Sequence, residues 1–412
     1  MKNVKYLTSN RLLVGLVLFC FFFVVFISCN NEGSRWEEPE DYGPVNSELD
    51  AILKSLPANT ADNPHTVSLT VSNMDFFGGT LKSNSNKYVI LDLSSSTIDN
   101  IPAYAFYTIY DYNTLAGFIM PDSVTSIGNS AFYYCSNLKT IDVANTNPVY
   151  SSVDGILYNK NKTILLKYPG GKTGTFNVPG SVTEIGREAF SYCTKLKSIE
   201  IPDSVTFIGR GAFVCTSLEN VTLPINIKSI EYGTFGGCTS LININLPQDL
   251  TNIDDFAFSG CTSLTGIIIP DSVVSIGYSA FYRNFNLASI NIPDGVISIE
   301  DRTFGNCTNL ASIIIPRGVT SIGVAAFHHC TSLSSIIIPD SITSIGDGAF
   351  YSCTKLASVT FESIISSGRF SIATREMPPP FNPFPGDLWQ KYIAGGIGTY
   401  TRTLPSTVWT KQ

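Results

Sequence analysis

The sequence is poor in the residues and motifs on which most enzymes depend. Its 412 residues include three histidines, and charged residues make up 14% of the total. No Gly-x-Ser-x-Gly, His-Glu-x-x-His or calcium-loop pattern is present, and the glycine-rich stretch at 395–398 lacks the lysine of a phosphate-binding loop. The formal net charge is -7, which offers no basic surface to nucleic acid. We therefore predict a protein that is not an enzyme and has no catalytic residues, cofactor or nucleic-acid partner.

What the sequence does contain is a repeat. Its unit, A-F-x-x-C-x-x-L-x-x-I-x-I-P-x-x-V-x-x-I-G, has one alternating apolar segment that ends at proline and another that ends at glycine, so each unit predicts two short strands. A fixed period of this size is typical of a solenoid, whose units bury their apolar faces against one another. The period is 23 residues from Phe235 onward. The repeated phenylalanines are Phe106, Phe132, Phe190, Phe213, Phe235, Phe258, Phe281, Phe304, Phe327 and Phe350.

The repeat resembles a known family. The segments CTSL at 330–333, IPDS at 338–341 and SIG at 344–346 match the leucine-rich repeat of the BspA type, found on bacterial cell surfaces, and the match covers 91–361. The resemblance implies a β-rich solenoid of 23-residue units, with short parallel strands stacked into a curved rod between N- and C-terminal caps. It also implies a secreted or surface-attached recognition scaffold or adhesin, whose partner is a host matrix protein or another extracellular protein.

Eight of the ten cysteines fall one to a repeat, and we assign them the same phase. Equivalent side chains in stacked turns point in parallel, which disfavours disulfides because their geometry needs converging Cβ vectors. One thiol per turn also lacks the paired spacing of a zinc site, so we predict no bound metal. Asn284 takes this phase in its own turn, which indicates a small buried group bonded to the backbone of the bend. The eight are Cys135, Cys193, Cys215, Cys238, Cys261, Cys307, Cys330 and Cys353.

The N-terminus has the pattern of an export signal. Three basic residues precede an apolar run over 12–27, which is short for a membrane-spanning helix, and Ser28 and Cys29 follow. This junction resembles the lipobox of bacterial lipoproteins, so we predict lipidation at Cys29 and an exported chain, anchored by lipid to the membrane of the cell envelope and exposed at the cell surface. The alternative is an uncleaved membrane anchor, which leaves the remainder outside the cytoplasm as well.

The composition along the chain predicts five segments. Polar residues at 30–63 suggest a flexible tether, with a short helix at its end where Leu49, Ile52, Leu53 and Leu56 have helical spacing. Two apolar runs at 154–169, joined by an Asn-Lys-rich connection, predict a β-hairpin, which resembles an insertion that recurs in the family. The segments are a lipoprotein signal peptide (1–29), the tether (30–63), an N-terminal cap (64–105), the solenoid (106–361) with its hairpin insertion near 144–178, and a C-terminal cap (362–412).

Shorter patterns predict elements inside the caps. Alternating residues over 66–71 and 88–93 suggest strands in the N-terminal cap. In the C-terminal cap, residues 387–393 suggest one or two helical turns and 400–409 suggest a strand.

A ladder of outward-facing residues is the first candidate binding surface. In a leucine-rich repeat, the residue between the two paired aliphatics of each strand points outward on the concave face. Isoleucine at three of these positions would leave apolar side chains in solvent, which commonly marks a partner site, although β-branched residues also stabilise a sheet by themselves. The ladder comprises Asp142, Glu200, Thr222, Asn245, Ile268, Asn291, Ile314, Ile337 and Thr360.

An aromatic ridge at the variable pair before each cysteine is the second candidate. Tyrosine suits both protein interfaces and stacking on sugars, whereas scattered surface aromatics are the simpler interpretation. Two adjacent histidines in the ridge could bind a metal weakly, but the pair varies freely between repeats. The ridge comprises Tyr133, Tyr134, Tyr192, Tyr282, His328, His329 and Tyr351.

These observations support one leading hypothesis and two alternatives. The leading one is a surface-exposed scaffold that binds an extracellular protein through the concave ladder. The first alternative is a glycan-binding surface protein, for which the aromatic ridge would matter more. The second is an enzyme or enzyme inhibitor that acts through the caps or the insertion.

Overall fold

The computed structural model describes residues 45–74, 77–108, 113–365 and 383–412. The chain divides into two units, 1–40 and 41–412, and every described residue belongs to the second. Cys29, the predicted signal peptide and the first part of the predicted tether lie outside the described residues. Within the described ranges, no helix has the length and apolar character needed to cross a membrane.

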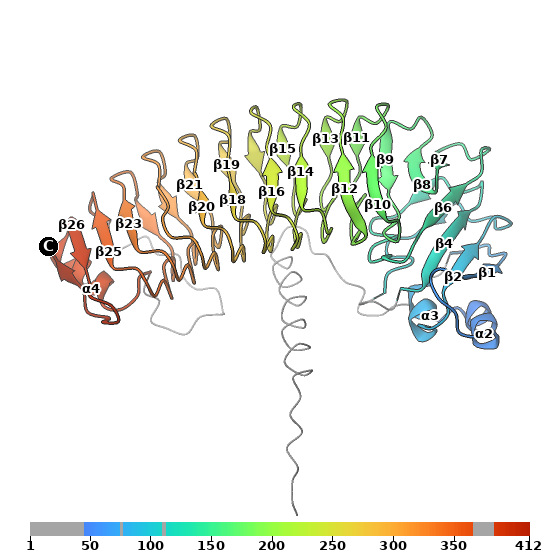
Figure 1. Cartoon of the computed structure of the whole chain (residues 1–412), viewed down its shortest axis with the longest axis horizontal. Helices are drawn as coiled ribbons and strands as arrows, with labels where there is room; N and C mark the ends of the chain where they lie inside the picture. Colours follow the sequence, from blue (N-terminus) through green and yellow to red (C-terminus); the bar gives the residue numbers. More distant parts are fainter. Residues whose placement is uncertain (1–44, 75–76, 109–112, 366–382) are drawn as a thin grey trace, which may run out of the picture. The chain divides into compact units, whose positions relative to one another are not determined.

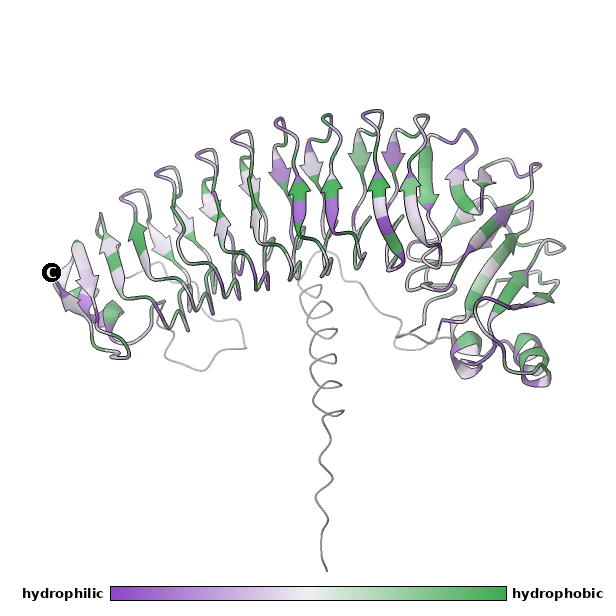
Figure 2. Cartoon of the chain, viewed as in Figure 1, coloured by the Kyte–Doolittle hydropathy of each residue, from purple (hydrophilic) through white to green (hydrophobic). Residues whose placement is uncertain are grey.

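The described residues form a β-solenoid of about 13 turns, in which parallel strands lie about 23 residues apart (Figure 1). This confirms the predicted fold class. Equivalent residues of successive turns are paired, as in Ile299–Ile322 and Ile322–Ile345. Because a slip of one residue would turn every side chain to the opposite face, this register keeps the apolar positions inside. Figure 2 shows the resulting alternation of hydrophobic and hydrophilic residues along the strands.

Two rows of short strands build the turns. Most strands of the first row lie shortly before the proline of the repeat. Most strands of the second row lie directly before a glycine or an acidic residue at the equivalent position. The first row comprises β1 (His65–Ser68), β2 (Val89–Asp92), β4 (Leu115–Met120), β6 (Thr140–Val143), β10 (Gly174–Asn177), β12 (Leu196–Glu200), β14 (Asn220–Thr222), β16 (Asn243–Asn245), β18 (Gly266–Ile267), β20 (Ser289–Ile290), β23 (Ser335–Ile338) and β25 (Ser358–Phe361). The second row comprises β3 (Asn100–Ile101), β5 (Ser126–Ile127), β11 (Glu184–Ile185), β13 (Phe207–Ile208), β15 (Ser229–Ile230), β17 (Asn252–Ile253), β19 (Ser275–Ile276), β21 (Ser298–Ile299), β22 (Ser321–Ile322) and β24 (Ser344–Ile345).

Stacked phenylalanine rings run through the interior. From Phe190 to Phe350, consecutive rings of the row have centroids 5.1–5.8 Å apart and planes within 15° of parallel. At the C-terminal end Phe384 continues the stack, 4.8 Å from Phe350. The rings from Phe190 to Phe350 are buried, so each turn completes the core of its neighbours.

The cysteines form a second internal row, as predicted. All eight in the described residues are thiols. The Sγ of Cys261 lies 3.1 Å from the carbonyl oxygen of Phe235, and in its own turn the amide Nδ2 of Asn284 donates to Phe258 at 3.0 Å. Burial raises the pKa of the Cys307 thiol to about 12, so it stays protonated at neutral pH. The row therefore supplies buried hydrogen-bond donors to the bends.

Cys215 departs from this row, and the prediction that all eight cysteines share one phase is wrong there. In most turns the leucine follows the phenylalanine by six positions, whereas Leu218 follows Phe213 by five. The buried position therefore falls to Thr216, whose hydroxyl lies 3.3 Å from the Sγ of Cys238. Cys215 moves to the preceding position, which has a positive φ of 55° and is partly exposed.

The N-terminal cap includes part of the predicted tether. Helix α2 (Ser47–Ser55) begins after Asn46, whose side chain accepts a hydrogen bond from the Leu49 backbone N–H at 2.9 Å. Leu49 and Leu53 are buried in the same apolar cluster as β1 and β2, so the helix packs on the solenoid instead of forming a free tether. A second helix, α3 (Gly78–Ser83), covers the same end.

The C-terminal cap pairs with the last turn. It contains α4 (Leu388–Gly395), β26 (Gly398–Thr401) and β27 (Thr410–Lys411), so the single strand predicted at 400–409 is wrong. The chain turns back between β26 and β27, and β26 lies antiparallel to β25. The Arg402 guanidinium donates to the carbonyl oxygens of Leu356 at 2.7 Å and Thr354 at 3.1 Å, which satisfies groups that a further turn would otherwise bond.

The insertion forms the predicted hairpin and one further strand. β8 (Ile156–Asn159) and β9 (Ile164–Lys167) are antiparallel, and β7 (Tyr150–Val153), which the sequence did not predict, pairs with β8. β9 then pairs in parallel with β11. β7, β8 and β9 of the insertion therefore extend the second row of strands, whereas β10 at its end pairs with β12 in the first row.

Candidate functional site

The structure places the isoleucines of the ladder in solvent. Ile268, Ile314 and Ile337 are 84%, 83% and 55% exposed. The flanking Ile336 and Ile338 are buried, because successive side chains of a strand point to opposite faces. Ile314 and Ile337 lie in consecutive turns, and Ile268 lies two turns before Ile314. Together they form an apolar patch on the solvent-facing side of the first row of strands.

The remaining ladder residues divide the surface by polarity. Asp142, Glu200, Thr222, Asn245 and Asn291 are exposed, so the ladder is acidic and then polar before the isoleucines. Thr360 is the exception. It is only partly exposed because β26 lies beside it, and its hydroxyl is 2.9 Å from that of Thr399. The C-terminal cap therefore limits the patch at this end.

Asn291 interrupts the isoleucines in a specific way. Its side-chain oxygen accepts from the Ile269 backbone N–H at 2.8 Å, and its Nδ2 donates to the Ile269 carbonyl oxygen at 2.7 Å. The amide therefore bonds the neighbouring turn and leaves Ile268 and Ile314 protruding on either side. This contact holds two turns in register beneath the patch.

The aromatic ridge is not a continuous surface. Tyr134 and Tyr192 are buried, with ring centroids 3.9 Å apart, and Tyr133 packs edge-on at 5.1 Å from Tyr192. The prediction that these three project as a ridge is wrong for Tyr134 and Tyr192, since their rings pack against each other and Tyr134 also contacts Tyr107. Sequence alone does not reveal this inward packing.

The rest of the ridge is partly accessible. Tyr282, His328 and His329 are partly exposed, and Tyr351 is exposed. The His328 ring stacks on Tyr351 at 5.5 Å, and burial lowers the pKa of His328 to about 4, so this imidazole is neutral at pH 7. Across the described ranges, no group of three histidine, cysteine or acidic residues is placed to hold a metal ion.

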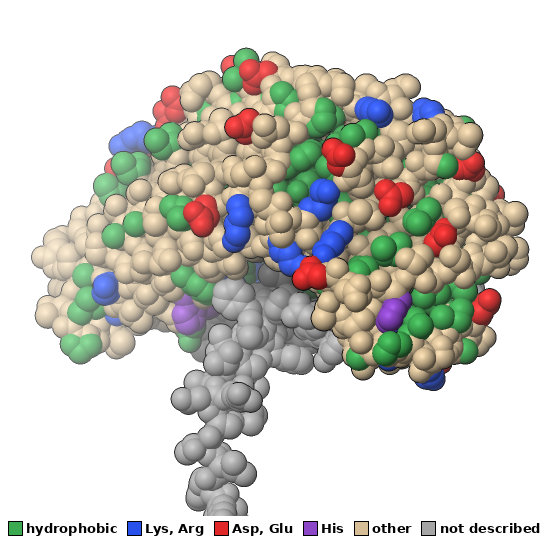
Figure 3. All heavy atoms as spheres, turned by 45° about the vertical axis from the view of Figure 1, so that its right-hand side comes forward, with side chains coloured by type: hydrophobic (Ala, Val, Ile, Leu, Met, Phe, Trp, Pro, Cys, Tyr) green, Lys and Arg blue, Asp and Glu red, His purple; other side chains and the backbone are tan. Residues whose placement is uncertain are grey.

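Two further exposed apolar residues were not predicted from the sequence. Val274 and Ile297 are 56% and 67% exposed, and they adjoin β19 and β21 in the second row. The sequence does contain a signal for them. The position directly after the repeated valine is polar in most repeats, whereas Val274 and Ile297 are apolar. Elsewhere charged residues are few, and Figure 3 shows lysine, arginine and acidic side chains spread over a mainly uncharged face, with several basic and one acidic side chain gathered near its centre.

Comparison with known proteins places this geometry in context. A family model described as "BspA type Leucine rich repeat region" matches residues 76–163, 168–287 and 274–374, which is more than half of the chain. No curated protein matches.

Solved structures of bacterial repeat proteins are also similar to this chain. A leucine-rich repeat protein from Eubacterium ventriosum ATCC 27560 is 29% identical over 70% of this chain and 69% of its own, with a TM-score of 0.46. A leucine rich cell surface protein from Faecalibacterium prausnitzii A2-165 is 25% identical over 75% and 96%, with a TM-score of 0.44. The pneumococcal vaccine antigen PcpA is 22% identical over 68% and 62%, with a TM-score of 0.42.

Proposed function

The chain belongs to the BspA-type leucine-rich repeat family, and we propose that it is a cell-surface scaffold that binds an extracellular protein through its ladder. Proteins of this family are bacterial cell-surface proteins. The observation that carries the proposal is the exposure of Ile268, Ile314 and Ile337, each of which lies between buried isoleucines of the solenoid core. A partner that covered them would gain about 1.5–3 kcal/mol for each side chain fully removed from water. A preformed solenoid surface also loses little conformational entropy on binding.

A lipid anchor at Cys29 is the proposed means of attachment. Its support is the sequence pattern at the N-terminus, where a small residue precedes the cysteine after an apolar run. We expect cells that express the chain to incorporate labelled palmitate into it, and the Cys29→Ala variant to lose the label. Equal labelling of the variant would contradict lipid anchoring at this residue.

The ladder is tested with two matched variants of residues 30–412. In the first, Ile268, Ile314 and Ile337 become asparagine. In the second, Val274 and Ile297, which are also exposed and apolar but lie beside the other row of strands, become asparagine. We expect one protein from a panel of purified extracellular matrix proteins to bind, and the first variant to weaken that binding about tenfold or more because the central apolar contacts are lost.

The second variant should bind as the unmodified protein does. Circular dichroism of both variants establishes that they fold. Equal losses in the two variants, or no loss in the ladder variant, would contradict the proposal, as would a panel in which no protein binds.

A further inference from the structure

The regular stacking of turns is interrupted at one step. In most repeats the glycine after the second strand lies directly on the preceding turn, and a Cβ added to Gly209 would come within 2.7 Å of the Arg187 backbone nitrogen. At Gly186 the nearest atom is instead Leu165 O, in the insertion, at 3.1 Å. The turns at 127–133 and 186–190 are therefore separated by the insertion at this step.

The backbone ladder changes at the same step. Phe106 donates its N–H to Ala131 at 3.0 Å, and Phe190 donates to Ala212 at 2.7 Å. The carbonyl oxygen of Ala189 lies between these steps, and it accepts from Tyr168 of the insertion at 2.8 Å. The ring of Tyr168 also takes the place of a stacked phenylalanine, 5.2 Å from Phe190.

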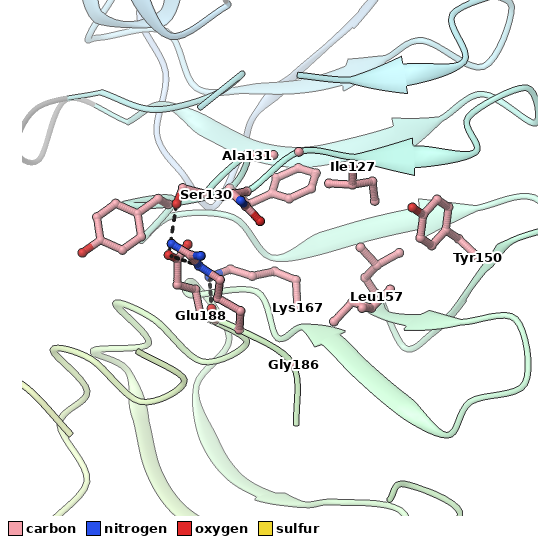
Figure 4. A pocket seen from close by; sticks show the side chains of 14 residues that line it. Ile127, Ser130, Ala131, Tyr150, Leu157, Lys167, Gly186 and Glu188 are labelled. Carbon is pink, nitrogen blue, oxygen red and sulfur yellow. Dashed lines mark hydrogen bonds and ion pairs between the residues drawn. The ribbon is translucent and has the colours of Figure 1, made fainter. Parts of the chain in front are cut away.

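A cavity of about 190 Å³ lies where the direct contact is missing (Figure 4). One wall comes from residues 127–133, the opposite wall from 186–188, and the insertion supplies the third side. This cavity was not predicted, because its walls depend on the path of the 144–178 insertion between two turns. It is separate from the ladder patch, whose isoleucines begin at Ile268.

The polar wall of the cavity is built around Glu188. Its carboxylate accepts from the Ser130 hydroxyl at 3.0 Å and from Arg187 Nε at 3.2 Å, and both bonds end on Oε1. Among the described residues, this leaves Oε2 as an acceptor for a ligand. Lys167 Nζ lies behind the wall and donates to the Glu188 carbonyl at 3.1 Å and to the Ser191 hydroxyl at 2.8 Å. Glu188 is buried, whereas the Arg187 side chain is one-third exposed at the edge of the cavity.

The other sides of the cavity are apolar and aromatic. Ile127, Leu157 and Leu166 line it together with the ring of Tyr150. The Tyr150 hydroxyl donates to the Thr125 carbonyl at 3.4 Å, which holds the ring across from the charged wall. A ligand inside would therefore meet hydrogen-bonding groups on one side and carbon surfaces on the other.

These features define the chemistry of the ligand. A cation would meet Arg187 and Lys167, and an anion would meet the carboxylate of Glu188, so neither sign of charge is favoured. A neutral sugar ring has hydroxyls that donate to a carboxylate and accept from a guanidinium, and it has C–H faces that pack on aromatic rings. We propose that this cavity binds one neutral monosaccharide residue of an extracellular glycan.

The proposal is tested on residues 30–412 with an array of neutral and acidic oligosaccharides, followed by calorimetric titration with the free sugars that bind. We expect at least one neutral saccharide to bind. Glu188→Gln should weaken this binding about tenfold or more, because a charge-assisted hydrogen bond is lost. Leu166→Trp, which fills the cavity and leaves the polar wall in place, should abolish it.

Glu219→Gln is the matched control, since it makes the same change at an exposed residue outside both the ladder and the cavity, and its affinity for the saccharide should equal that of the unmodified protein. Thermal melting identifies any variant that does not fold. Saccharide binding by the unmodified protein tests the proposal even if a variant does not fold. Three results would overturn the proposal. They are binding of no neutral saccharide, binding of acidic saccharides alone, and undiminished binding by folded Leu166→Trp. Both cavity variants should still bind the matrix protein that the ladder recognises. Loss of saccharide binding is therefore distinguishable from failure of the proposed protein-binding function.

Discussion

Replacing Phe281 with alanine is expected to lower the free energy of unfolding by about 3–5 kcal/mol, the usual cost of removing a large aromatic side chain from a core. Phe281 is fully buried, and its ring lies 5.4 Å from Phe258 and 5.8 Å from Phe304. The substitution therefore removes a ring from the middle of a continuous stack. In a solenoid each turn contacts mainly its neighbours, so the defect weakens the interfaces on both sides.

Urea unfolding followed by circular dichroism measures this loss. Phe281→Leu is the matched control, because leucine keeps the site apolar and fills most of it, and it should cost clearly less than the alanine substitution. A loss below about 1 kcal/mol for Phe281→Ala would contradict the conclusion that the phenylalanine stack is a principal source of stability.

Gly346→Ala is expected to destabilise the protein by about 1–3 kcal/mol, the typical cost of forcing an extra carbon into a packed site. A Cβ at Gly346 would lie 2.4 Å from the Val324 nitrogen and 2.5 Å from the Gly323 carbonyl carbon. Both are backbone atoms of the preceding turn, so no side-chain rotation can relieve the clash. The two turns would have to separate, which disturbs the pairing of β22 with β24.

Gly180→Ala is the control for this prediction. Its added Cβ would meet no atom within 4 Å, so it should leave stability unchanged or raise it by up to about 1 kcal/mol through a less flexible unfolded chain. The urea midpoints of the two variants should therefore move in opposite directions or differ widely. Similar midpoints would contradict the role of the glycine as the close contact between turns.

The solenoid was predictable because its determinants are local and repeated. A proline follows most strands of the first row, glycines such as Gly209 and Gly346 allow a close approach between turns, and the 23-residue period implies stacking of the units. The thiol row was predictable for the same reason, since Asn284 at the cysteine phase indicates a donor to the bend. The outward direction of Ile337 follows from the alternation of side chains in β23.

The departures come from places where the repeat is broken. A single residue is missing between Phe213 and Leu218, and this moves Cys215 out of its row. The shift is visible in the sequence only when the turns are aligned by their phenylalanines, because Cys215 follows Phe213 by two positions, one fewer than in the other turns. The inward packing of Tyr134 and Tyr192 depends on contact between two turns that lie on either side of the insertion, 58 positions apart in the sequence. The cavity beside Glu188 has the same origin, because it is formed by residues 58 positions apart, such as Ser130 and Glu188.

Contacts at the C-terminal end were also beyond the sequence. The repeat pattern stops after Phe361, so nothing periodic indicates that β26 would reverse direction and pair with β25. The role of Arg402 follows from the carbonyl groups that the last turn leaves open, and this requires the positions of both segments. For the ladder, the consequence is that Thr360 lies beneath the cap while Ile337 remains exposed.

The most direct test of the proposed function is to locate the bound partner on the surface. A photoreactive phenylalanine analogue is introduced in place of Ile314 in one protein and in place of Ile297 in another, and each is irradiated with the matrix protein that binds best in the panel. Docking on the ladder predicts a covalent adduct from position 314 and none from position 297. An adduct from position 297 alone, or from neither position while binding persists, would contradict it.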